Sequence, residues 1–143
     1  QRQRQRQRQR QRQRQRQRHQ TMTLSYLDFE YSEDAAGAGS FDAVASTLAE
    51  RVPAVLAELN VVLRWANDSF AGLLGPLDEG FEWDVQLSCS RESVALDKIA
   101  FDLERQKVVI LPGEAGPERH TLSISISGTP AFCDAFRERF GVD

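Results

Sequence analysis

The chain has 143 residues, with 18 Lys and Arg, 21 Asp and Glu, and a formal net charge of −3. This length corresponds to a single domain. No stretch approaches the ~18 consecutive apolar residues of a membrane-spanning helix, and no apolar segment typical of a secretory signal peptide precedes the first strand-like run. The sequence therefore predicts a cytoplasmic protein that does not enter a membrane.

Nine Gln-Arg dipeptides make up residues 1–18 and contain no apolar side chain to offset the entropy lost on ordering. The only methionine, Met22, directly precedes the first strand-like run, so we interpret residues 1–21 as a low-complexity tail that is disordered or not native. Because nine of the 18 basic residues are tail arginines, residues 22–143 carry nine basic and 21 acidic side chains, a net charge of −12. This single acidic domain is a poor ligand for nucleic acid or anionic membranes, whereas a native Arg tail would suit phosphates.

Residues 24–31 alternate apolar and polar side chains, which predicts a half-buried strand. Residues 41–48 fit either a helix or the return strand of a hairpin. We favour the strand, because a helix running through Pro53 would lose a hydrogen bond and clash. From residue 52 to residue 70 the apolar positions form one helical stripe, and Pro53 suits the first turn of that helix.

Four further strand-like runs follow a Gly- and Pro-rich loop, at residues 81–89, 99–104, 107–111 and 120–127. Apolar and polar side chains alternate in most of them, as in strands that have one buried and one solvated face. Near the C-terminus, Thr129 fits a helix N-cap, Pro130 the first helical position and Gly141 the stop. The fold expected is α+β: a two-layer sandwich with a mainly antiparallel sheet of five to six strands and two helices on one face.

The sequence offers few groups for catalysis or for binding a cofactor. Outside the tail the only histidine is His120, and there is no nucleophile-elbow motif or phosphate-binding glycine loop. Cys89 and Cys133 lack the spacing of a zinc site, so we interpret them as buried free thiols in a reducing compartment. We therefore expect a protein that binds no cofactor and is not an enzyme.

Four carboxylates crowd the segment "GPLDEGFEWDVQLS", namely Asp78, Glu79, Glu82 and Asp84. The spacing does not match a calcium-binding loop, whose ligands follow a fixed pattern closed by a bidentate Glu. If Phe81 begins a strand, two of the acids lie on its polar face and two in the preceding loop. A divalent-metal site or metal-dependent enzyme built on the four remains the alternative hypothesis.

Paired acids recur on the polar side of three predicted strands: Asp28 and Glu30, Glu82 and Asp84, Asp102 and Glu104. If these strands share a sheet, its uncovered face carries about six carboxylates and forms a docking surface for a basic protein by charge complementarity. The competing interpretation is that the charges only keep the face soluble and block edge pairing. Trp65 lies off the apolar stripe of its helix, which suits either a partner-binding anchor or a ring covered by the following loop.

These observations favour a small, acidic, non-enzymatic binding protein with a basic protein partner. No motif in the chain indicates a known family. The strand order, the oligomeric state and the partner's identity have no signature in the sequence.

Overall fold

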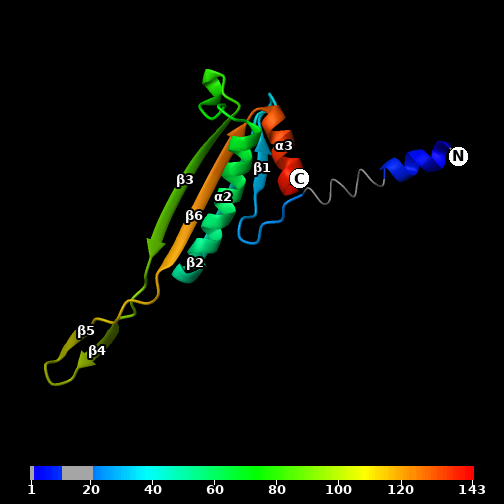
Figure 1. The fold of residues 1–143 in the computed structure, drawn as a ribbon. Helices are drawn as coiled ribbons and strands as arrows, with labels where there is room; N and C mark the ends of the chain where they lie inside the picture. Colours follow the sequence, from blue (N-terminus) through cyan, green and yellow to red (C-terminus); the bar gives the residue numbers. More distant parts are fainter. Residues whose placement is uncertain (1, 11–20) are drawn as a thin grey trace.

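A computed structural model describes residues 2–10 and 21–143 and has an α+β fold with a mainly antiparallel sheet (Figure 1). Residues 2–10 are helical and their side chains are exposed. Gln and Arg both favour helices, but a Gln-Arg repeat has no apolar face to bury. The rest of the predicted tail up to residue 20, together with residue 1, lies outside the described residues.

Four antiparallel strands form the main sheet, in the order β1-β2-β6-β3. Their bounds are β1 Glu30–Glu33, β2 Gly39–Leu48, β3 Trp83–Glu92 and β6 Arg119–Gly128. The hairpin interpretation of residues 41–48 is confirmed, since β2 pairs with β1 across a turn in which Gly37 has a φ of 87°. Glycine reaches this left-handed region without steric cost.

The strand predicted over residues 24–31 is wrong in extent, because ladder pairing begins only at Glu30. The alternation that suggested it is nevertheless present: Leu27 and Phe29 are buried, and Asp28 is exposed. The backbone N–H groups of Ser25, Tyr26 and Leu27 donate hydrogen bonds to the Glu58 side chain and not to a neighbouring strand. The alternating sequence pattern therefore predicted the extended backbone correctly, but it did not predict the hydrogen-bond partners of the N–H groups.

Helices α2 Val52–Ser69 and α3 Pro130–Phe140 match the predicted helices, and short 3-10 turns occupy η1 Ala49–Arg51 and η2 Leu77–Glu79. Thr129 caps α3 by accepting a hydrogen bond from the backbone N–H of Phe132, and Gly141 ends α3 in the left-handed conformation. The buried side chains of the two helices follow the predicted stripes: Val55, Leu59, Val62 and Ala66 on α2, and Phe132, Cys133, Phe136 and Phe140 on α3.

Aromatic contacts join α3 to one face of the sheet and α2 to α3. The ring of Phe41 on β2 stacks on Phe136 of α3 with centroids 4.0 Å apart, and Trp83 on β3 stacks on Phe132 of α3 at 5.8 Å. Trp65 of α2 contacts Phe132 and Phe136 at 5.8 and 5.7 Å, which packs α2 against α3. The opposite side of the four strands is not covered by either helix.

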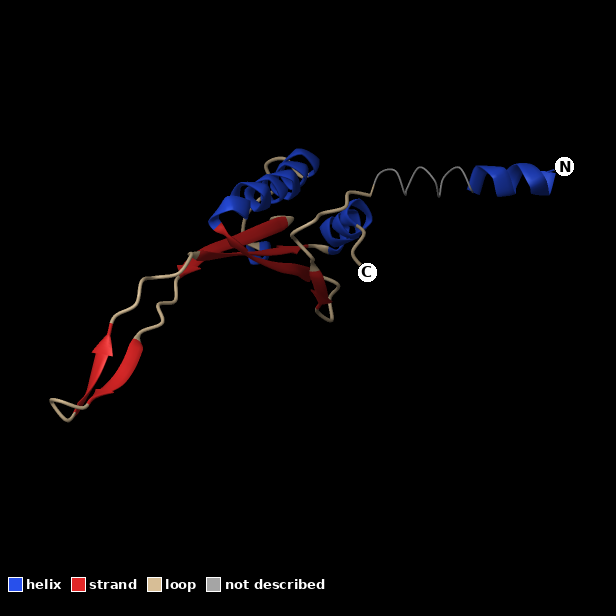
Figure 2. Ribbon diagram, turned by 90° about the horizontal axis from the view of Figure 1, so that it is seen from below, coloured by secondary structure: helices blue, strands red, loops and turns tan. Residues whose placement is uncertain are grey.

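The prediction of one sheet of five to six strands is wrong, because β4 Lys98–Asp102 and β5 Lys107–Leu111 form a separate two-stranded sheet. Figure 2 shows this ribbon extending away from the four-stranded sheet and both helices. The alternating residues Ile99, Phe101 and Leu103 are 70%, 56% and 80% exposed instead of buried. Helices α2 and α3 lie over the main sheet, and no described element covers the ribbon.

The second half of β3 is also left uncovered by the helices. Leu87, which alternation assigned to the core, is 55% exposed, and Cys89 is exposed as well. The interpretation of both cysteines as buried thiols is therefore correct for Cys133 and wrong for Cys89. Burial raises the pKa of the Cys133 thiol, which keeps that sulfur protonated and unreactive.

Candidate functional site

The side of the main sheet turned away from α2 and α3, here called the open face, is assembled by strand register. Alternate residues of each strand share it, and cross-strand partners lie side by side: Asp42 with Ser125 and Gln86, then Val44 with Ser123 and Ser88. Its members are Glu30, Ser32, Ser40, Asp42, Val44, Ser46, Leu48, Asp84, Gln86, Ser88, Ser90, Glu92, Arg119, Thr121, Ser123, Ser125 and Ser127. Hydroxyl-bearing side chains predominate in this set.

The hydroxyls of the open face bond to one another across the strands. Ser88 and Ser123 are hydrogen-bonded, and the Ser32 and Ser40 hydroxyls are 3.1 Å apart. Thr121 Oγ1 donates to Ser46 Oγ over 3.4 Å. Small side chains in pairs give a flat surface. Ser46 Oγ accepts hydrogen bonds from both Thr121 and Arg119, whereas the hydroxyls of the two serine pairs keep a lone pair that can accept a hydrogen bond from a ligand.

Acidic side chains gather toward the end of the open face that holds β1. Glu30 and Asp42 are direct cross-strand partners and are both exposed. Asp84 lies on the same face, two strands away from β2, and its Oδ1 accepts a hydrogen bond from the Val85 N–H at 2.9 Å. At the opposite end Arg119 is the one basic member of the set, and its Nη1 donates to Ser46 O over 3.1 Å. The end near β1 therefore presents negative charge that no member of the set neutralises.

The pairing of Glu30 with Asp42 leads to a stability prediction. Like charges directly opposite on neighbouring strands repel, so Asp42→Asn is expected to raise the free energy of unfolding by about 0.2–1 kcal/mol. A double-mutant cycle with Glu30→Gln, followed by urea denaturation, measures this repulsion. Strictly additive effects of the two substitutions would show that the carboxylates do not interact.

A shallow depression of about 470 Å³ lies on the open face and is flanked by Asp42, Gln86, Ser88 and Ser125. Val44, which is 62% exposed, lines the same depression. The carboxylate, amide and hydroxyl oxygens around the depression can accept hydrogen bonds from the N–H groups of a ligand. Val44 can contact the aliphatic part of the same ligand side chain. Lysine and arginine have both an aliphatic stem and a cationic end.

The predicted partner-binding acids are only partly brought together. Glu30 and Asp84 share the open face, and Asp28 is exposed in the extended segment directly before β1. Glu82 is instead engaged by Thr129, whose Oγ1 donates to the Glu82 carboxylate at the start of α3. A carboxylate at that position is stabilised by the partial positive charge of the helix N-terminus.

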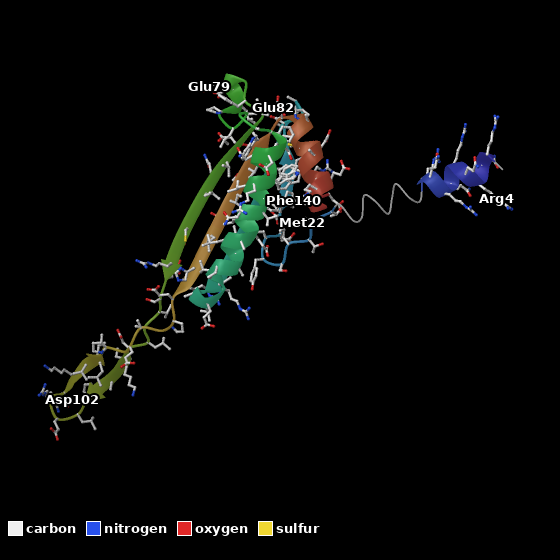
Figure 3. The ribbon with its side chains drawn as sticks, in the orientation of Figure 1. Arg4, Met22, Glu79, Glu82, Asp102 and Phe140 are labelled. Atoms are coloured by element: carbon white, nitrogen blue, oxygen red, sulfur yellow. The ribbon has the colours of Figure 1, made fainter. Side chains whose placement is uncertain are left out.

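Asp102 and Glu104 are not on the main sheet, which corrects the prediction of a shared acidic face. Figure 3 shows Asp102 at the far end of the two-stranded ribbon, remote from Glu82. Asp102 Oδ1 accepts hydrogen bonds from the N–H groups of Glu104 and Arg105, at 3.0 and 3.2 Å. This is the local turn-forming use of aspartate. Alternation alone does not distinguish a ribbon strand from a strand of the main sheet.

Trp65 makes ring contacts with four phenylalanines and is only partly exposed. Its centroid lies 5.3 Å from Phe140 and 6.3 Å from Phe70, besides the contacts with Phe132 and Phe136. The loop that follows α2 was expected to cover the indole, but α3 covers most of it. Packing between the two helices accounts for this residue without a partner.

The four carboxylates of the metal hypothesis do not converge. Asp78 and Glu79 lie in η2, the Glu82 side chain is bound by Thr129, and Asp84 lies on the open face (Figure 3). Among residues 2–10 and 21–143, no group of three or more His, Cys, Asp or Glu side chains is arranged to hold a metal ion. This geometry gives the metal hypothesis no support.

The sequence analysis missed Asp42 and Val44 as site residues. Both lie in the segment whose secondary structure was ambiguous, so their place on a sheet face had no firm basis. Another carboxyl group, Glu33, accepts a hydrogen bond from the Tyr31 hydroxyl at 2.8 Å. Partial burial and then this hydrogen bond raise the pKa of Tyr31 to about 12, so the phenol is neutral at ordinary pH.

No protein-family model, characterised protein or solved structure matches this chain. No helix of the described part is both long and apolar enough to cross a membrane. The open face is therefore the feature from which a function can be inferred.

Proposed function

We propose that this protein is a non-enzymatic binding protein whose open face docks a basic segment of another protein. The observation that carries the proposal is the depression formed by Asp42, Val44 and Gln86 on a face that neither helix covers. Glu30 and Asp84 add negative charge to the same surface. In this proposal the body is a two-layer sandwich, with one layer of helices for stability and a bare sheet face for recognition.

Charge supports the choice of a basic partner. Residues 22–143 carry a net charge of −12, which attracts and steers a cationic ligand over a distance. The repulsion between Glu30 and Asp42 costs stability in the free protein, and a bound cation would relieve it. The two cysteines are free, which fits a reducing compartment such as the cytoplasm.

A fluorescent octa-arginine peptide tests this function. The protein is used from Thr21 onward, because the tail arginines would compete with the probe and the core cluster lies entirely within residues 22–142. Binding is expected to weaken steeply between about 50 mM and about 200 mM salt, as for any charge-driven contact. The double substitution Asp42→Lys and Asp84→Lys is expected to weaken binding by about tenfold or more.

The matched control is the double substitution Asp134→Lys and Glu138→Lys, on the exposed side of α3. It changes the net charge in the same direction but leaves the open face intact, so affinity is expected to change by less than about twofold per charge. Equal losses in the two variants would mean that binding follows net charge and not the open face. Salt-independent binding would likewise contradict the proposal.

A further inference from the structure

The ribbon of β4 and β5 has one entirely apolar face. In the register of this ribbon Ile99 is opposite Ile110, and Phe101 is opposite Val108. These four side chains alternate in phase, so they lie on one side of the ribbon, here called the arm face, and each is at least 56% exposed. The other side carries Lys98, Ala100, Asp102, Lys107, Val109 and Leu111.

An isolated two-stranded ribbon is marginally stable in water and needs a packed face to be stable. Long, exposed, apolar strands are also prone to aggregate, so such a surface is usually covered in the functional protein. No described part of this chain covers the arm face. Another molecule can supply this cover.

We propose that a second copy of this chain covers it, with the two arm faces packed against each other around a two-fold axis. A two-fold interface uses the same patch on both subunits, and an uncharged apolar face of β-branched and aromatic residues is complementary to itself. Face-to-face packing of sheets about 10 Å apart is a standard arrangement for such surfaces. This inference does not depend on the proposed function of the open face.

The exposed apolar area of the arm face is close to what one side of a small dimer interface requires. Five large apolar side chains with the alternation of this face are exposed, namely Ile99, Phe101, Leu103, Val108 and Ile110. At about 60–120 Å² of apolar surface for each fully exposed side chain, they present roughly 200–400 Å². One side of a specific interface at the small end of the usual range buries about 600 Å², of which somewhat more than half is apolar.

The length of the β4–β5 arm, residues 93–118, also reduces the electrostatic repulsion between two associated copies of the chain. Two bodies that each carry a net charge of −12 repel, but the outgoing half of the arm, residues 93–102, spans about 30 Å at ~3.3 Å per residue. Arms packed in opposite directions hold the bodies apart by more than the screening length of about 8 Å at physiological salt. The arm face itself carries no charge.

The experiment compares the mass in solution of the full chain and of two neighbouring variants, by light scattering coupled to size exclusion. The unsubstituted chain is expected at twice its mass of 16.2 kDa. Ile99→Lys places a charge on the arm face and is expected to weaken dimerisation by about 100-fold or more. Ala100→Lys makes the same charge change on the opposite side of the same strand, and the dimer is expected to persist.

A monomer at all concentrations, an open-ended series of larger species, or equal loss of the dimer in both variants would overturn the proposal. Hydrogen exchange of the unsubstituted chain provides a readout that needs no variant. Amide protection in β4 and β5 is expected to rise with protein concentration while protection in β2 and β6 stays constant. Protection of β4 and β5 that is independent of concentration would contradict self-association through the arm.

Discussion

Replacing Trp65 with alanine is expected to lower the free energy of unfolding by about 3–5 kcal/mol. The indole lies between α2 and α3 and contacts Phe70, Phe132, Phe136 and Phe140, with centroids 5.3 to 6.3 Å apart. Its removal takes away the ring that joins the two helices and leaves its four phenylalanine neighbours without this contact. Urea denaturation measures the loss, which is a large share of the stability of an ordinary domain.

Leu56→Ala is the control for this substitution, because Leu56 lies on the same helix and is 46% exposed. Its loss is expected to stay below about 1 kcal/mol, since little buried surface is removed. If Trp65→Ala were no more destabilising than Leu56→Ala, the indole would not be a core residue. The earlier hypothesis of a partner-binding anchor would then regain support.

Glu58→Ala is expected to destabilise the protein by about 2–3 kcal/mol and to free the segment before β1. The Glu58 carboxylate on α2 accepts hydrogen bonds from the N–H groups of Ser25, Tyr26 and Leu27 at 2.9 to 3.1 Å. Hydrogen bonds to a charged acceptor are stronger than neutral ones, and these three hold Leu27 in the core. Without them the three amides are expected to exchange with solvent much faster.

Asp68→Ala serves as the control, because it removes an exposed carboxylate from the same helix. Its effect is expected within about 0.5 kcal/mol. Glu58→Gln keeps one side-chain oxygen as an acceptor and is expected to lose less stability than Glu58→Ala. Unchanged exchange of residues 25–27 in Glu58→Ala would show that the carboxylate does not anchor the segment.

Local chemistry predicted the helices well. Pro53 at the start of α2, the Thr129 cap and Gly141 each act through their own backbone and near neighbours, so their roles are readable from the sequence. The apolar stripes on both helices were likewise correct, except that Leu56, which belongs to the predicted stripe of α2, is exposed. These features depend on residues within a few positions of one another.

The features that sequence reasoning missed depend on distant contacts. Alternation showed that Ile99 and Phe101 share a side, but it carries no information on whether a helix covers that side. For the same reason Leu87 was assigned to the core although α2 and α3 do not cover it. Glu82 and Asp84 are two residues apart, so alternation places them on the same side of a strand. Only Asp84 is paired with a residue of a neighbouring strand, whereas the Glu82 side chain is bound by Thr129. The acidic surface is consequently smaller than predicted and is centred on Asp42 as well as Asp84.

The open face, and not the helices or the ribbon of β4 and β5, is the surface proposed to bind a basic ligand. Amide chemical shifts of the isotope-labelled protein from Thr21 onward, titrated with octa-arginine, locate the bound peptide residue by residue. The largest shifts are expected at Val44, Ser123 and Ser125, which line the depression. Shifts confined to α2, α3 or the β4–β5 ribbon would contradict this proposal.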